Sequence, residues 1–351
     1  MKICLITDTH FGARNSSPVF DAYFEKFYKD CFFPELQKRG VDTIVHLGDC
    51  FDHRRYINFG ALKSCKRYFF DKIRYFGLTM HVIAGNHDCY LKNTNDVNSV
   101  DLLLSEYDCI KSYSEHQVVD FDGTPILLMP WICSSNYNES IEALETAKTD
   151  IVFGHFEIAG FQMYKGAMNE HGFSKAVFDR FDIVYSGHFH HRSSDSNISY
   201  LGTPYEIVWS DSGDPKGFHI FDTETRELEF IGNPFTIFEK YYYDDTKEDA
   251  DQIPSSMFEG KMVKIVAVHK TDVNKFENFI ERINKKNPVD LKVVEDYSEF
   301  ELTAIDDENI NVEDTFSIIE NYIDSAETDL NRDRLKDFMK TLYIETVHSV
   351  C

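Results

Sequence analysis

The segment Ser186-Gly187-His188-Phe189-His190 follows an apolar run that ends at Tyr185. Two histidines separated by one residue point to opposite sides of an extended backbone, or fan out where the backbone turns. Alone, a His-x-His pair is weak evidence for a metal site. Four earlier segments share its pattern of an apolar run, a turn and a side chain that can bind a metal: residues 3–10, 44–49, 82–88 and 151–155. We therefore expect the five strand ends to meet at one two-metal site.

The strand before each turn alternates with a helix in the first part of the chain. Apolar runs at 3–7, 41–47 and 78–84 predict strands, and helical spacing predicts helices at 18–37 and 59–76. This order is typical of an α/β fold with a parallel sheet. Residues 93–98 are polar and are expected to form a loop.

Later segments suggest how the chain divides. We predict a core domain at 1–235, a polar, acidic linker at 236–257 and a small α+β domain at 258–305, which has a strand-helix-strand pattern. Two amphipathic stretches within 306–351 predict a C-terminal helical hairpin. Its apolar stripes could pack on the chain's own core or bind a partner helix, and the sequence leaves both readings open.

Composition limits the possible classes of protein. The chain has 351 residues, of which 42% are hydrophobic, enough for a large domain and a smaller one. Its eight cysteines are typical of reduced thiols in a cytoplasmic protein, because they show no Cys-x-x-Cys spacing. No apolar run is long enough for a membrane span. The formal charge of −24 argues against a simple nucleic-acid-binding protein.

The residue types at the strand ends favour a particular chemistry. Aspartate, histidine and asparagine suit octahedral coordination through nitrogen and oxygen, which indicates Mn²⁺, Fe²⁺, Mg²⁺ or Zn²⁺ rather than a thiolate site. Two such ions, about 3.5–4 Å apart, clamp a phosphate during in-line displacement. Asp49 could bridge them, because its carboxylate has two oxygens and Gly48 allows close backbone approach.

The segment Gly85-Asn86-His87-Asp88 offers a proton donor. His87 could protonate the leaving oxygen as a general acid. Asp88 could orient the imidazole of His87 or simply cap the following turn, and both readings stay open. Taken singly, Asp8 could be a turn residue and His155 a core histidine, whereas His46 is expected to be structural.

Five motifs together resemble the calcineurin-like metallophosphoesterases. These are Asp8-x-His10, Gly48-Asp49-x-x-Asp52, Gly85-Asn86-His87-Asp88, Gly154-His155 and Gly187-His188-x-His190. Within that superfamily the chain resembles the nuclease component of SbcCD-type complexes, the double-strand-break repair nuclease family, and in particular the recombination endonuclease subunits of T-even phages. Further matching stretches lie at 129–131, 200–204 and 217–225.

The resemblance implies a set of roles for these residues. One metal ion would be held by Asp8, His10, Asp49 and His190, and the other by Asp49, Asn86, His155 and His188. His87 would be the proton donor. The implied fold is a four-layer α/β sandwich with a small capping domain that controls DNA access. The C-terminal helical segment would bind the coiled coil of an SMC-like ATPase, within a heterotetramer that contains a homodimer of this chain.

From these motifs we expect a Mn²⁺-dependent DNA exonuclease and endonuclease that acts in recombination, double-strand-break repair and replication, on double- and single-stranded DNA. It would work in the cytoplasm, that of the host cell if a phage encodes it. The alternatives are a phosphatase or phosphodiesterase of the same superfamily, and an inactive scaffold that recruits the ATPase.

The acidic composition requires another source of attraction for DNA, since phosphate contacts normally come from lysine and arginine. We expect the metal ions and the partner to supply it. Arg54 and Arg55 lie beside the metal loop. A further set on one predicted helical face is either a DNA contact or an ordinary solvated surface: Lys63, Lys66, Arg67 and Arg74.

Overall fold

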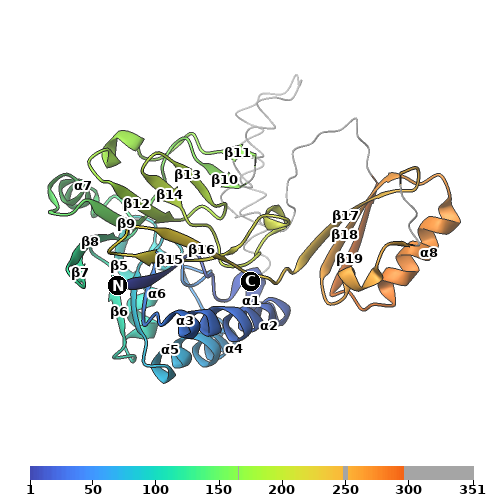
Figure 1. Ribbon diagram of the computed structural model, residues 1–351, viewed down its shortest axis with the longest axis horizontal. Helices are drawn as coiled ribbons and strands as arrows, with labels where there is room; N and C mark the ends of the chain where they lie inside the picture. Colours follow the sequence, from blue (N-terminus) through green and yellow to red (C-terminus); the bar gives the residue numbers. More distant parts are fainter. Residues whose placement is uncertain (165, 248–251, 296–351) are drawn as a thin grey trace, which may run out of the picture. The chain divides into compact units, whose positions relative to one another are not determined.

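The computed structural model describes residues 1–164, 166–247 and 252–295 (Figure 1). The first sheet has the strand order β16-β15-β1-β2-β3-β6. Its strands are β1 (Lys2–Ile6), β2 (Thr43–His46), β3 (Thr79–Ile83), β6 (Ile110–Tyr113), β15 (Gly217–Asp222) and β16 (Leu228–Gly232). Strands β1, β2, β3 and β6 run parallel, and β15 pairs with β1 in the antiparallel sense.

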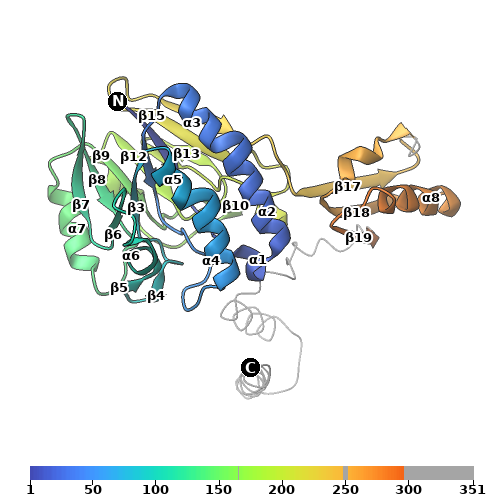
Figure 2. The ribbon, with the colours of Figure 1, turned by 90° about the horizontal axis from the view of Figure 1, so that it is seen from below.

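Helices cover one face of this sheet (Figure 2). They are α1 (Ala13–Ser16), α2 (Pro18–Phe27), α3 (Phe33–Arg39), α4 (Phe59–Cys65) and α5 (Asp71–Tyr75). One π-helical turn joins α2 to α3, and another joins α4 to α5. The two long predicted helices are therefore confirmed, each as two helices in direct succession.

The second sheet has the order β13-β14-β12-β9-β8-β7. Its strands are β7 (Gln117–Phe121), β8 (Thr124–Met129), β9 (Ile151–His155), β12 (Ile183–Gly187), β13 (Ser193–Asp195) and β14 (Ile198–Tyr200). Strands β8, β9, β12 and β14 run parallel. Helix α7 (Tyr137–Thr146) and a 3₁₀ turn at Lys175–Phe178 contribute to the apolar cluster on its outer face.

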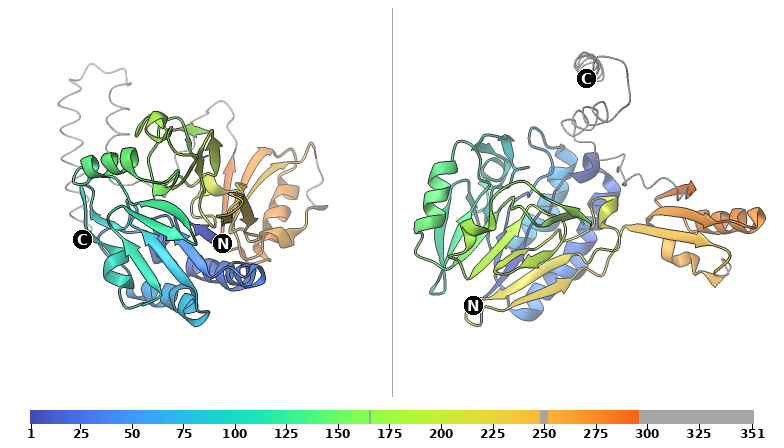
Figure 3. Two further views of the ribbon diagram at one scale, coloured as in Figure 1. Left: turned by 60° about the vertical axis from the view of Figure 1, so that its left-hand side comes forward. Right: turned by 90° about the horizontal axis from the view of Figure 1, so that it is seen from above.

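Side-chain alternation along β1 explains the layering. Ile3 and Leu5 join the apolar cluster between the two sheets, whereas Cys4 and Ile6 join the cluster under the helices of the first sheet. Successive side chains of a strand point to opposite faces, so a strand buried on both faces is apolar throughout. The predicted four-layer sandwich, helix-sheet-sheet-helix, is confirmed (Figure 3).

One predicted loop is wrong. The polar residues 93–98 include strand β5 (Thr94–Asn98), which pairs with β4 (Cys89–Leu91) before helix α6 (Ser99–Leu104) begins. The side chains of Asn95 and Asn98 are buried and hydrogen-bonded, so polarity along this strand does not mean exposure. A further short hairpin, β10 (Gln162–Tyr164) and β11 (Ala167–Met168), follows β9.

The predicted linker at 236–257 is wrong in its first part. That part forms strand β17 (Phe238–Asp244), which pairs in parallel with β18 (Met262–His269), itself parallel to β19 (Asp290–Glu295). Helix α8 (Val273–Asn284) connects β18 to β19. Tyr243 of β17 is buried with Phe279 of α8, and this burial stabilises a strand that also contains Phe238, Tyr241 and Tyr242.

Three other expectations concern the chain as a whole. No helix among the described residues is long and apolar enough to cross a membrane. The cysteines in the described part of the chain are unpaired, and most are buried, as expected. The predicted helical hairpin in 306–351 lies outside the described residues.

Candidate metal centre

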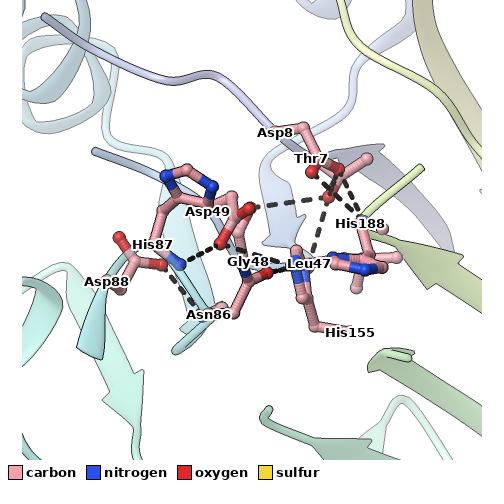
Figure 4. A network of polar contacts seen from close by, with 12 residues as sticks. Thr7, Asp8, Leu47, Gly48, Asp49, Asn86, His87, Asp88, His155 and His188 are labelled. Atoms are coloured by element: carbon pink, nitrogen blue, oxygen red, sulfur yellow. Dashed lines mark hydrogen bonds and ion pairs between the residues drawn. The ribbon is translucent and has the colours of Figure 1, made fainter. Parts of the chain in front are cut away.

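The candidate metal-binding side chains lie at the carboxyl ends of parallel strands from both sheets. Such strand ends are where ligands bind in open α/β sheets. The turns after β1, β2 and β3 carry Asp8 and His10, Asp49, and Asn86 with His87; β9 ends at His155, and the loop after β12 carries His188 and His190. Figure 4 shows most of these side chains pointing toward one another. The structure therefore brings all seven predicted ligands together.

Asp8, His10 and His190 form one group that could hold a cation, with one ligand atom of each within 4.8 Å of the others. The Nε2 atoms of His10 and His190 lie 3.2 Å apart, and Asp8 Oδ1 lies 3.9 Å from His10 Nε2. Two imidazole nitrogens at this distance need a proton or a cation between them. This group contains three of the four residues predicted for the first ion.

Asp49, His155 and His188 form a second such group. Asn86 Oδ1 lies 2.9 Å from His155 Nε2 and 3.0 Å from His188 Nδ1, so the fourth predicted residue joins it. The carboxylate of Asp49 faces both groups. Its Oδ1 lies 3.4 Å from His155 Nε2 and its Oδ2 lies 3.8 Å from His10 Nε2. The predicted bridging position of Asp49 agrees with these distances.

Tight backbone approach makes this convergence possible. The loops after β1 and β2 run side by side, with the Asp8 amide donating to the Gly48 carbonyl over 3.0 Å. A Cβ atom added at Gly85 would lie 2.2 Å from the Asp49 nitrogen, and one at Gly187 would lie 2.1 Å from Thr7 Oγ1. Only glycine fits at these two positions.

Hydrogen bonds from outside the groups orient the ligand side chains. The Thr7 hydroxyl donates to Asp8 Oδ2 over 2.6 Å, and the backbone amide of His188 also donates to that carboxylate. His155 Nδ1 lies 2.7 Å from the Leu47 carbonyl. Because a carbonyl only accepts, Nδ1 carries the proton and Nε2 faces Asp49. Such contacts fix the ring and the tautomer of a metal-binding histidine.

The electrostatics of the site suit a cation. Burial lowers the pKa of His10, but Asp52, Asp49 and Asp8 outweigh it and raise the value to about 9. Burial also lowers the pKa of His155, but Asp49 and Asp8 outweigh it and raise the value to about 9. Without metal, protons on these rings balance the buried carboxylates, and they occupy the positions that cations would take. The donor set and its charge therefore fit divalent metal ions.

His87 lies beside these two groups and forms a further possible cation-binding group with His10 and Asp52. Its backbone amide donates to Asp49 Oδ1 over 2.7 Å, and its ring centroid is 5.0 Å from that of His10. Its Nδ1 lies 2.6 Å from the Asp52 carbonyl and therefore donates to it, which leaves Nε2 as the nitrogen that can exchange a proton with a substrate.

Asp52 is a site residue for which the sequence predicted no role. Its Oδ1 lies 3.3 Å from His10 Nδ1, on the side of the ring opposite His190. Burial raises the pKa of Asp52, but His10 and His87 outweigh it, so the carboxyl stays ionised. Its place three residues after Asp49, within the second motif, was the available sequence signal.

Asp88 does not orient His87, and this predicted catalytic role is wrong. Its carboxylate accepts hydrogen bonds from the backbone amides of Cys50, Phe51 and Gly85, at 2.9–3.2 Å, and from the Ser99 hydroxyl at 3.0 Å. The side chain is fully buried beneath the loop that carries Asp49. Asp88 thus links that loop to the turn after β3. This is closer to the alternative prediction that Asp88 caps a turn, with added contacts to a second loop.

Other polar residues near the site have structural partners. His46 Nε2 contacts the Thr9 hydroxyl at 2.9 Å, in agreement with its expected structural role. On the candidate basic helical face, Lys66 pairs with Glu106, Arg67 with Glu25 and Arg74 with Asp71. These pairs favour the ordinary solvated surface.

Arg54 is half-buried, and its Nη1 has no hydrogen-bond partner among the described residues.

Comparison with known proteins identifies the family. Residues 1–192 match the family model of the calcineurin-like phosphoesterases. The chain belongs to this family. As a calcineurin-like phosphoesterase it is a metal-dependent hydrolase of phosphate esters, and the matched residues include all seven candidate ligands.

The family assignment is supported by a relative from a phage. Over 352 aligned positions the chain is 32% identical to exonuclease subunit 1 of Enterobacteria phage T4, and the alignment covers 98% of this chain and 99% of the relative. Among solved structures, it is similar to an archaeal phosphodiesterase (14% identity, 66% of this chain and 99% of that one, TM-score 0.34). It is also similar to a nuclease of Pseudomonas putida (14% identity, 65% and 87% of the two chains, TM-score 0.32).

Proposed function

We propose that this calcineurin-like phosphoesterase is the nuclease component of a larger complex and hydrolyses DNA phosphodiester bonds as an exonuclease and endonuclease. The observation that carries the proposal is the pair of ligand groups that share Asp49, in a chain aligned over nearly its full length with a phage exonuclease subunit. The nuclease would act in recombination, double-strand-break repair and replication, in the cytoplasm of an infected host cell.

In this proposal Asp8, His10, Asp49 and His190 hold one divalent ion, and Asp49, Asn86, His155 and His188 hold the other. When bound, the two ions supply a more acidic water and neutralise charge on the phosphate oxygens. The donors are nitrogen and oxygen and no thiolate is among them, which fits Mn²⁺, Mg²⁺, Fe²⁺ or Zn²⁺, and of these we propose Mn²⁺.

His87 would protonate the leaving oxygen of the cleaved strand. The hydrogen bond from Nδ1 to the Asp52 carbonyl fixes the ring, so Nε2 is the nitrogen through which the imidazolium form would give up a proton. A positioned acid of this kind contributes about 10²–10⁴-fold to a rate. Arg54, two residues after Asp52 in the same loop, is a candidate for a contact to a phosphate oxygen.

The word "subunit" in the name of the phage relative supports a role within a complex. We propose an SMC-like ATPase partner bound through residues 306–351, a homodimer within the heterotetramer, and a capping role in DNA access for residues 258–305. With a net charge of −24 and internally paired basic residues, the isolated chain should bind DNA weakly and with steep salt dependence.

The test is cleavage of linear double-stranded and single-stranded DNA by the purified full chain with Mn²⁺, beside the variant His87→Asn and a small phosphate ester. We expect DNA to be cut and the variant to lose about 10²-fold or more of the rate while it keeps its metal ions. The matched control is His116→Asn, which changes an exposed histidine on the loop before β7.

Each other outcome contradicts part of the proposal. Hydrolysis of the small ester alone would favour a phosphatase or phosphodiesterase of the same family. No hydrolysis of either substrate, with or without an SMC-like ATPase, would favour an inactive scaffold.

A further inference from the structure

Lys216 is a buried lysine directly behind the candidate metal centre. Only 3% of its side chain is exposed. Its ammonium donates to the carbonyl oxygen of His190 over 2.8 Å, and it lies 2.8 Å from Asp211 Oδ1 and 3.0 Å from Asp214 Oδ2. An ammonium has three donors, and here each has one acceptor. The geometry therefore gives Lys216 a fixed position rather than a range of surface conformations.

The two carboxylates that hold Lys216 are themselves anchored. Asp211 Oδ2 accepts from the backbone amides of Ile207 and Val208 at 2.8 and 2.9 Å. Asp214 Oδ1 lies 3.0 Å from His191 Nδ1. A buried ammonium is costly unless it is paired and fully hydrogen-bonded, and this arrangement meets both conditions.

The remaining contact of Lys216 is to the residue that carries a candidate metal ligand. His190 lies in the loop between β12 and β13, and its carbonyl accepts from Lys216 and from the Thr203 amide, the latter over 3.2 Å. Its imidazole faces His10 at the other end of the residue. We propose that Lys216 is a positioning residue that holds the His190 backbone so that the imidazole reaches the metal ion bound with Asp8 and His10.

Because Lys216 is positively charged, its removal should change metal affinity in one direction if it positions His190 and not in that direction if it has no such role. A positive charge near a cation site repels the ion, so removing it would leave metal binding unchanged or strengthen it if Lys216 did nothing else. Loss of positioning has the opposite sign, because partners of a metal ligand are worth about 10–100-fold in metal affinity. The two readings therefore differ in direction as well as size.

The experiment is a Mn²⁺ titration of the full chain, followed by electron paramagnetic resonance, for wild type, Lys216→Met and Lys216→Arg. We expect two ions in wild type, and in Lys216→Met a weakening of one of them by about 10–100-fold. Lys216→Arg should restore it, because a guanidinium can donate to the same three acceptors. Lys261→Met is the matched control, since Lys261 pairs with Glu239 in the β17–β19 sheet.

Wild-type or tighter binding of both ions by a folded Lys216→Met would overturn the inference. If circular dichroism shows that Lys216→Met is unfolded, the same Mn²⁺ titration is made with Asp214→Asn. This substitution replaces a charged acceptor of Lys216 by a neutral amide, so it should weaken the same ion to a smaller degree, and unchanged affinity would count against Lys216. The inference rests on the proposed metal site: a wild-type chain that binds no ion would overturn both, whereas two ions in wild type and in every variant would overturn this inference alone.

Discussion

Asp49 and Asp88 are two buried aspartates at neighbouring strand ends, and their surroundings give them different roles. Asp49 faces His155, His87 and His10, which outweigh the effect of burial and hold its pKa well below the usual value. Burial and the charge of Asp49 raise the pKa of Asp88, although the amides around it act in the opposite direction. A buried aspartate surrounded by histidines, such as Asp49, lies at a site where metal ions can replace protons. A buried aspartate surrounded by backbone amides, such as Asp88, anchors the structure.

Asp49→Asn tests the first side of this comparison and should have the largest effect. An amide oxygen lacks the charge that two shared ions require, so we expect at least one ion to be lost and DNA cleavage to fall by about 10³-fold or more. The measurements are Mn²⁺ per chain and the cleavage rate. Retention of both ions with full activity would show that Asp49 is not the shared ligand.

Gly85→Ala tests the close approach that places Asp49 beside the turn after β3. The added Cβ would lie 2.2 Å from the Asp49 nitrogen, so the loop must shift, and a shift of about 1 Å can cost about 10²-fold in rate. Gly232→Ala is the control, because a Cβ there meets only a Phe230 ring carbon at 3.7 Å. Equal cleavage rates for the two variants would contradict the argument.

Asp52→Asn sharpens the comparison, because Asp52 contacts a ligand histidine without belonging to either predicted ligand set. We expect about 10–100-fold weaker binding of the ion held by His10, since the Nδ1 contact that orients the ring loses its charge. Isothermal titration with Mn²⁺ checks it. The second ion should keep its affinity, and equal weakening of both would point to a general loss of structure.

Asp88→Asn should have the smallest effect on catalysis. The buried amides and Ser99 lose a charged acceptor, so the free energy of unfolding should fall by about 1–3 kcal/mol, as measured by urea denaturation. Cleavage by the folded variant should fall by less than about tenfold, because neither ligand group contains Asp88. Complete loss of Mn²⁺ binding in a folded Asp88→Asn would remove the distinction between the two aspartates.

The same comparison explains what could be predicted from the sequence. Strand-end position and residue type predicted that Asp8, His10, Asp49, His155 and His190 meet at one metal site, because the carboxyl ends of parallel strands in a sheet lie at the same edge. Apolar runs between helices predicted the parallel strands. The four-layer sandwich and the division of the ligands between two ions were implied only by the family resemblance.

The contacts of Asp88 with the amides of Cys50 and Phe51 were not predictable, because these amides belong to a distant loop and leave no trace in residue identity. Strand β17 was missed for another reason. Its charged residues Glu239, Lys240 and Asp244 favoured a linker, although its four aromatic residues are of types that favour a strand. Its pairing with β18 and the burial of Tyr243 decide its conformation. The role proposed for Lys216 likewise depends on its contact with the His190 carbonyl, which the sequence does not reveal.

The most direct test of the two-metal account is a single titration in which Mn²⁺ occupancy and the rate of linear DNA cleavage are measured on the same wild-type sample. If two ions act together at this site, the sample should bind two ions per chain, and the cleavage rate should rise with occupancy of the second ion. Full-rate cleavage with one ion bound, or with none, would contradict it.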